Sequence, residues 1–145
     1  MKNTTIRRAL MVLMLGGTLI WMACTTAWIG EAEQIVAVLI PATVNLVTLA
    51  ATLQGSNVSA ADFQTIQSAG AQAGADLQLM QSLIAQYQNA EAAAKPGLLN
   101  QIQAALRAVQ LTLNGLLPAL HIKDAASQAK ITAVVGILIS EAESV

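Results

Sequence analysis

Apolar side chains recur at alternating steps of three and four residues along the later part of this chain. The first such seam comprises Phe63, Ile66, Gly70, Ala73, Leu77, Met80, Ile84 and Tyr87. The second comprises Leu99, Ile102, Leu106, Val109, Leu113 and Leu116. A shorter third set comprises Ile131, Val134, Val135, Leu138 and Ala142. This spacing is typical of amphipathic helices that pack through heptad seams, with the intervening glutamines on the outside.

Capping and turn residues separate these seams into three helices. Ser59 and Asp62 form a weaker version of the capping box, in which the third helical position is normally Glu or Gln. Asn89–Lys95 reads as a turn, and Pro96 suits the first position of the next helix, where its missing N–H costs nothing. Asp124 is the expected N-cap of the last helix, which should run to about Ser144. The expected stop residues before it are Gly115 and Pro118.

A further helix is predicted before Gln54, where a Gln-Gly-Ser-Asn run marks a break. Ile35–Leu53 is nineteen residues long and uncharged. Glu31 and Glu33 mark its expected start, because acids favour the positive end of the helix dipole, and Pro41 should kink or divide it. Its weakly polar or small positions form one narrow stripe of Gln34, Ala37, Pro41, Asn45, Thr48 and Thr52. The remaining apolar arc is wide enough to need cover from other helices, a partner or lipid.

Four helices joined by short connections favour antiparallel neighbours. The sequence therefore predicts an all-α protein, an up-down-up-down four-helix bundle preceded by an N-terminal hydrophobic export or anchor helix. The expected division is residues 1–29 for the leader and residues 30–145 for the bundle.

The leader has the form of an export signal. Met1–Arg8 is basic and Ala9–Met22 is an uninterrupted apolar run, followed by small residues. Three outcomes stay open: cleavage after Ala27, lipid attachment at Cys24, and an uncleaved anchor over residues 9–29. The segment before Cys24 resembles the bacterial lipoprotein signal, which implies a lipidated cysteine. Each outcome places the bundle outside the cytoplasm, in the periplasm or on the extracytoplasmic face of a membrane.

Composition narrows the function classes. Hydrophobic residues make up 55% of the chain and charged residues 10%. Eleven glutamines between Gln54 and Gln110 supply much of the polarity. Beyond residue 30, four cations face eight acids, so the later chain carries a net charge of −4. Without a basic patch to neutralise phosphates, nucleic acid is not expected as a partner.

Catalytic residues are scarce. His121 is the only histidine, and the acids lie mostly at helix ends, where capping and solvation explain them. A di-iron bundle site would need Glu-x-x-His pairs on facing helices, and a catalytic triad would need a base. We therefore expect no enzymatic activity, metal site or cofactor. With Cys24 as the one cysteine, an intramolecular disulfide is excluded.

Four residues are candidates for helix contacts rather than for chemistry. Gly70 and Gly74 lie in a nearly side-chain-free section, residues 69–75, which favours close approach of a neighbouring backbone. The alternative for this section is a ligand slot or hinge. Pro41 interrupts the apolar helix, and Asn45 is either a register-setting buried amide or an exposed member of the polar stripe.

These patterns predict an exported, membrane-tethered small helical bundle with a structural or protein-interaction role. The membrane is the expected partner of the N-terminal segment, and self-association or a protein partner is expected for the bundle. One alternative is an integral membrane protein with a transmembrane hairpin of residues 9–29 and 35–53. Another is a carrier that binds an apolar ligand in the bundle core.

Overall fold

A computed structural model describes the backbone of residues 3–55 and 57–144, and the side chains of residues 27–55 and 57–144. Over these residues the chain forms four helices. They are α1 (Asn3–Leu53), α2 (Ala60–Asn89), α3 (Lys95–Ala119) and α4 (Ala125–Glu143). The chain divides into two compact units, Met1–Ala32 and Glu33–Val145. The first unit contains the beginning of α1, and the second contains the rest of α1 with α2, α3 and α4.

Helix α1 differs from its sequence prediction at its start, and of the two outcomes expected at Pro41 the division of the helix does not occur. It begins at Asn3, so Glu31 and Glu33 lie inside a helix rather than at its start. It also continues through Pro41 without a break in helical structure. Proline in a helix interior removes one backbone hydrogen bond and costs about 3 kcal/mol. Burial of apolar residues on both sides of Pro41, at Leu39 and Leu46, offsets this cost.

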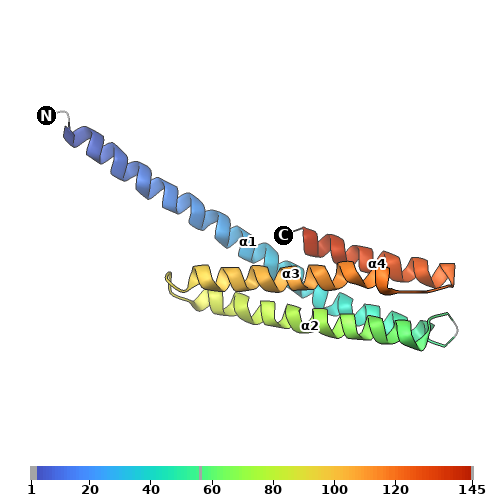
Figure 1. Cartoon of the computed structure of the whole chain (residues 1–145). Coiled ribbons are helices and arrows are strands. Elements are labelled where there is room, and N and C mark those ends of the chain that lie inside the picture. Colours follow the sequence, from blue (N-terminus) through green and yellow to red (C-terminus); the bar gives the residue numbers. More distant parts are fainter. Residues whose placement is uncertain (1–2, 56, 145) are drawn as a thin grey trace. The chain divides into compact units, whose positions relative to one another are not determined.

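Within residues 33–144, successive helices run in alternating directions and are joined by short connections (Figure 1). Helix α2 packs beside α3, and α3 packs beside α4. Contacts from residues 43 and 47 of α1 to Gly70 place α1 against α2. The prediction of an all-α, four-helix fold with an N-terminal apolar helix is confirmed.

The heptad seams form the core of the second unit. Seven of the eight predicted α2 positions are buried, as are five of the six in α3 and four of the five in α4. The exceptions, Phe63, Leu99 and Val134, are half-buried. Leu77, Met80, Ile102 and Leu138 are fully inaccessible to solvent. Helix α3 ends at Ala119, one residue after the predicted stop residue Pro118, whereas the other predicted stop residue, Gly115, lies inside the helix.

Helix α1 presents two different faces in the second unit. Its inner face is buried and comprises Ile35, Val36, Leu39, Thr43, Leu46 and Ala50. Its outer face is exposed and comprises Gln34, Ala37, Val38, Pro41, Val44, Asn45, Thr48, Ala51 and Thr52. All six members of the predicted polar stripe therefore lie on the outer face. The stretch Ala27–Leu53 is long and apolar enough to cross a membrane, but core helices of soluble proteins and signal sequences share these features.

Candidate functional site

The thin section of α2, residues 69–75, contains a close contact with α1 at Gly70. A Cβ atom built on Gly70 would lie 2.6 Å from Val47 Cγ2 and 3.8 Å from the Thr43 carbonyl oxygen of α1. Carbon atoms in contact normally lie about 3.5–4.0 Å apart, so a side chain at position 70 would displace α1. Gly74, one turn later, has nothing within 4 Å of the same built atom. Close approach therefore depends on Gly70, and Gly74 has space for a methyl group.

The other sequence-selected residues have separate locations. Pro41 and Asn45 are exposed on the outer face of α1, so neither packs inside the second unit. Cys24 lies within the span of α1, but its side chain is outside the described residues. The structure thus brings none of Pro41, Asn45 and Gly74 together with Gly70 in one pocket.

Asp62 links the start of α2 to the connection between α3 and α4, and only the contact with Ser59 could be predicted from the sequence. The residue as a whole is 5% exposed. One oxygen, Oδ1, accepts a hydrogen bond from the backbone N–H of His121 at 3.0 Å, across 59 positions of sequence. The other, Oδ2, accepts from the Ser59 hydroxyl at 2.8 Å, while the Asp62 N–H donates to Ser59 Oγ at 3.1 Å. Ser59 therefore caps α2, and the Asp62 carboxylate joins this cap to the connection between α3 and α4.

His121 contributes its backbone to this junction, whereas its side chain is exposed. Across the side chains that the structure describes, no group of three or more His, Cys, Asp or Glu residues is placed to hold a metal ion. The capping function of Ser59 and Asp62 was visible in the sequence. The bond to His121 was not, because only the packing of α3 and α4 brings position 121 to the start of α2.

The surroundings of Asp124, the N-cap residue of α4, favour its ionised form. The Asp124 carboxylate accepts a hydrogen bond from the Ser127 N–H at 2.8 Å. Hydrogen bonds from the side chain and backbone of Ser127 lower the pKa of Asp124 below its ordinary value, and Lys130 adds a smaller effect in the same direction. Ser127 itself is buried. The ionised form of Asp124 thus stabilises the start of α4.

Two pockets lie away from the thin section of α2. A groove of about 260 Å³ between α1 and α2 has an apolar floor of Val36 and Ile84. At its rim the Gln88 amide donates to Glu33 Oε2 at 3.2 Å. This volume is below the roughly 300–1,000 Å³ of typical small-molecule sites. Because neither pocket includes residues 69–75, the ligand slot considered for that section has no described cavity.

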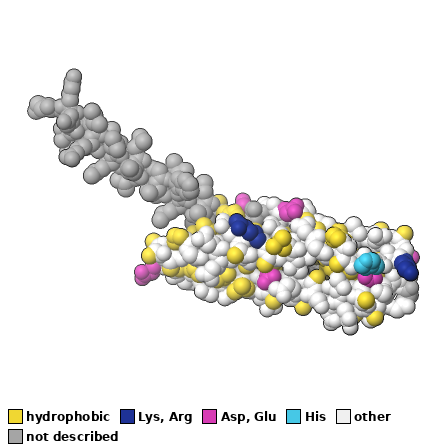
Figure 2. Space-filling model, in the orientation of Figure 1, with side chains coloured by type: hydrophobic (Ala, Val, Ile, Leu, Met, Phe, Trp, Pro, Cys, Tyr) yellow, Lys and Arg dark blue, Asp and Glu magenta, His cyan; other side chains and the backbone are white. Residues whose placement is uncertain are grey.

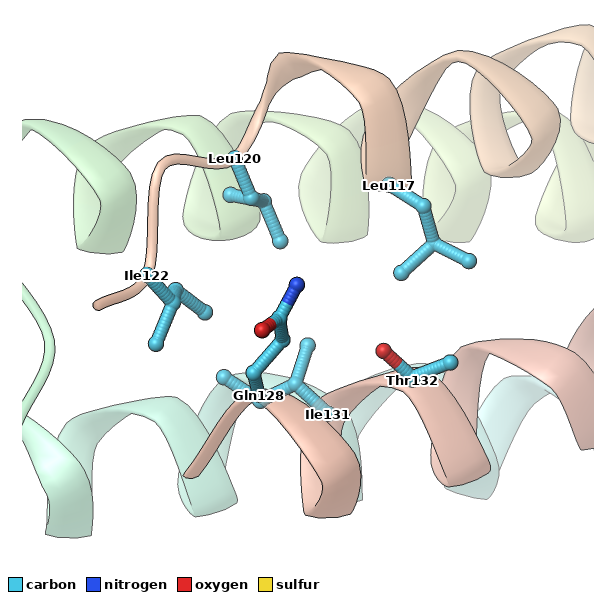
Figure 3. Close-up of a pocket in the computed structure, with 6 residues that line it drawn as sticks. All are labelled: Leu117, Leu120, Ile122, Gln128, Ile131 and Thr132. Atoms are coloured by element: carbon cyan, nitrogen blue, oxygen red, sulfur yellow. The ribbon is translucent and has the colours of Figure 1, made fainter. Parts of the chain in front are cut away.

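The second pocket, of about 70 Å³, lies where α3 passes into α4. Figure 3 shows the Gln128 amide extending from α4 into this space, which Leu117 and Leu120 border from the other side. Ile131 and Thr132 complete the α4 wall. The space is suited to a few water molecules rather than to a substrate.

No protein-family model, curated protein or solved structure matches this chain.

The surface of the second unit is weakly charged. Figure 2 shows a few charged side chains separated by broad uncharged areas on the visible face. Several large apolar side chains are exposed, among them Leu111 at 75% and Ile137 at 61%. On the outer face of α1, Val38 is 50% exposed and Val44 is 61% exposed.

Proposed function

We propose that this chain is an exported, membrane-tethered small helical-bundle protein with a structural or protein-interaction role and no catalytic activity. The observation that carries the proposal is the combination of a basic and apolar leader with a bundle whose helical seams are closed by its own helices. A leader of this composition directs export. A self-contained bundle folds without lipid around it, so the leader is the part that meets the membrane.

In the second unit, the buried polar residues and the close contact at Gly70 serve the stability of the fold, which is consistent with an interaction role. The buried polar groups Asp62 and Ser127 take part in helix caps, and the helix contact at Gly70 serves packing. Their arrangement stabilises the fold and leaves the exposed, uncharged surfaces as the features that require another explanation. A protein partner or a second copy of the chain would cover such surfaces.

The transmembrane-hairpin alternative receives less support. In a hairpin of residues 9–29 and 35–53, the second segment would have to leave the bundle, although Leu39, Leu46 and Ala50 are fully inaccessible there. The carrier alternative would need a cavity beside residues 69–75, and the two described pockets lie elsewhere.

Fractionation of cells that express the full chain, followed by intact mass measurement, tests the proposal. Protein in the membrane fraction with a mass that begins at Cys24 and includes acyl chains identifies a lipid-tethered bundle. Full-length protein that resists carbonate, but whose residues 57–144 are cleaved by protease added outside the membrane, identifies an anchored bundle.

Three results contradict the proposal in whole or in part. Recovery of full-length protein in the cytoplasm would remove export altogether. Full-length protein in which a cysteine introduced at Asn57, in the α1–α2 connection, is labelled only from the cytoplasmic side would instead support the hairpin. A chain that begins at Trp28 and is released by salt would retain export but remove the tether.

A further inference from the structure

The groove between α1 and α2 combines an apolar floor with groups that accept hydrogen bonds. Its floor is made by Val36 and Ile84, which are 2% and 3% exposed. The other lining residues are exposed and comprise Glu33, Ala37, Gln81, Ala85 and Gln88. Among these described lining residues the Glu33 carboxylate is the one charged group, and it is negative. A lining of this kind matches an occupant with an apolar body and a positively charged tip.

Pro41 adds a further hydrogen-bond acceptor to the groove. In an α-helix the N–H of residue 41 would donate to the carbonyl oxygen of residue 37. Proline has no N–H, so the Ala37 carbonyl lacks its helical donor, and Ala37 lines the groove. Ala37 follows Glu33 by one turn on the same face of α1, because positions four apart are neighbours on a helix. A single cation with several donors can therefore contact both groups.

The Glu33 carboxylate can accept a further donor. Its Oε2 accepts from the Gln88 amide at 3.2 Å, whereas an ionised carboxylate offers about four acceptor sites. An arginine fork binds both oxygens of a carboxylate at once, and here one oxygen already accepts from Gln88. A lysine ammonium is a compact charge with three donors. Lysine therefore fits this rim better than arginine.

The volume of the groove, about 260 Å³, suits one long side chain. The side chain of a lysine, with five heavy atoms at about 30 Å³ each, occupies about 150 Å³. A drug-sized ligand would need roughly 300–1,000 Å³. The alkyl stem of a lysine can lie along apolar surface while its ammonium group stays at a wet rim. This division matches the floor at Val36 and Ile84 and the rim at Glu33.

The charge of the second unit favours the approach of a positively charged partner. Residues 33–145 contain seven acids and four Lys or Arg residues, so their net charge is −3. A field of this sign attracts a cationic protein surface and raises its association rate. Lys95, the cation that begins α3, does not line the groove. Its Nζ atom lies instead over the Tyr87 ring, 5.2 Å from the centroid.

We propose that this groove is a docking site for a lysine side chain of a partner protein. The alkyl stem of that lysine lies on Val36 and Ile84, and its ammonium group donates to the Glu33 carboxylate and the Ala37 carbonyl oxygen. The inference rests on the proposed protein-interaction role and names the chemistry of the partner. An exposed ion pair contributes little affinity by itself, so the lysine is one anchor within a larger contact.

Binding of n-butylammonium, which reproduces the lysine side chain, tests the groove directly. Amide NMR spectra of the full chain in a neutral detergent are recorded while n-butylammonium chloride is added. We expect saturable shifts of the signals of Val36, Ala37, Ile84 and Ala85, with a Kd in the millimolar range because the probe has few atoms. Butanol and sodium chloride are the controls. Equal saturable shifts with butanol would mean that the groove does not select a cation, which overturns the proposal.

Two pairs of variants test the acceptors. Glu33→Gln removes the charge at the rim and should weaken n-butylammonium binding about two- to fivefold, as expected for an exposed ion pair. Glu91→Gln removes the same charge from the exposed connection between α2 and α3 and should change the affinity little. Pro41→Ala returns an N–H to the Ala37 carbonyl and should weaken binding about twofold, whereas Pro96→Ala, in the first turn of α3, should not. Unchanged affinity in Glu33→Gln overturns the proposal, and unchanged affinity in Pro41→Ala removes the Ala37 carbonyl from it.

Carbodiimide crosslinking identifies the source of the amine. A carbodiimide joins a carboxylate directly to an amine that contacts it, and the product keeps no spacer. In membranes from cells that express the full chain, we expect peptide mass analysis to find Glu33 joined to a lysine of another protein. Added n-butylammonium should compete with this crosslink, and Glu33→Gln should abolish it. Crosslinks at Glu91, an exposed acid outside the groove, give the background.

The outcomes separate this inference from the proposed function. Binding of n-butylammonium without a Glu33 crosslink to another protein means that a free amine is the occupant, which overturns the partner lysine. Glu33 crosslinks to lysines of this chain alone overturn it as well. Both results leave the tether intact when fractionation finds the chain on the membrane. A competed crosslink from Glu33 to another protein, in a chain that fractionation finds in the cytoplasm, supports the docking site and removes export.

Discussion

Replacing Gly70 by alanine is the most direct test of the packing between α1 and α2. The added Cβ would lie 2.6 Å from Val47 Cγ2, so about 1 Å of separation must be gained to reach ordinary contact. Val47 is β-branched and has one strongly preferred rotamer in a helix, so its methyl group cannot simply turn away. The adjustment must therefore come from a shift of α1 relative to α2. Overpacking of this kind typically costs about 1–3 kcal/mol.

A second effect acts in the opposite direction. Alanine is favoured over glycine in a helix interior by about 1 kcal/mol. For Gly70→Ala the two effects together predict a net loss of about 0–2 kcal/mol in the free energy of unfolding. Gly74→Ala is the matched control, because it lies one turn away in the same helix and has nothing within 4 Å of its built Cβ. It should stabilise the protein by about 0.5–1 kcal/mol.

Urea denaturation of the full chain, followed by far-ultraviolet circular dichroism, measures both changes. The double variant Gly70→Ala/Val47→Ala removes the methyl group that the new Cβ would meet. We expect it to recover part of the loss, with a coupling energy of about 1–2 kcal/mol between the two sites. Gly70→Ala that stabilises as much as Gly74→Ala, with no coupling to Val47, would refute the close crossing.

Three further measurements test the junctions and the core. Asp62→Ala should lose about 1–3 kcal/mol of stability, because it leaves the hydrogen-bond donors around a buried carboxylate without their acceptor. Asp76→Ala, at a partly exposed site on α2, should lose much less in the same urea titration. Equal losses of stability in the two variants would contradict the junction at Asp62. Leu138→Ala should lower the free energy of unfolding by about 2–5 kcal/mol. Ile137 is 61% exposed, so Ile137→Ala should change the melting temperature little. A larger loss of stability for Ile137→Ala than for Leu138→Ala would mean that α4 is rotated. Because the folded protein lowers the pKa of Asp124, its contribution is present above the unfolded pKa of about 3.9 and is lost as the pH falls through the folded value. The stability advantage of the wild type over Asp124→Asn should therefore narrow from neutral pH to acid, and a pH-independent difference would contradict the ionised cap.

The helical bundle could be predicted from the sequence because the apolar positions of each seam recur at the same spacing along the whole helix. A heptad of apolar residues identifies the buried face wherever the helix ends up, so Leu77, Val109 and Leu138 were correctly assigned to the core. The caps at Ser59 and Asp124 were predictable for a similar reason, since each involves residues only three positions apart.

Local pattern gave a wrong start for the helix that precedes Gln54. The dipole argument for Glu31 and Glu33 assumes a helix end at that point, but residues on both sides also favour helix, so α1 continues. Pro41 was expected to kink or divide the helix because a proline removes one hydrogen bond. The helix is not divided at Pro41. The buried side chains of Leu39 and Leu46, on either side of the proline, offset the lost hydrogen bond.

Taken by itself, the sequence determined the number of helices after residue 54 and the face that each buries; the export role of the leader stays a prediction. Tertiary structure decided which glycine is sterically required, because Gly70 and Gly74 are indistinguishable until Val47 is placed beside one of them. It also decided that Asp62 reaches His121 and that Asn45 faces outward. These features depend on contacts between residues far apart in the chain, and no local periodicity encodes which distant residue arrives opposite which.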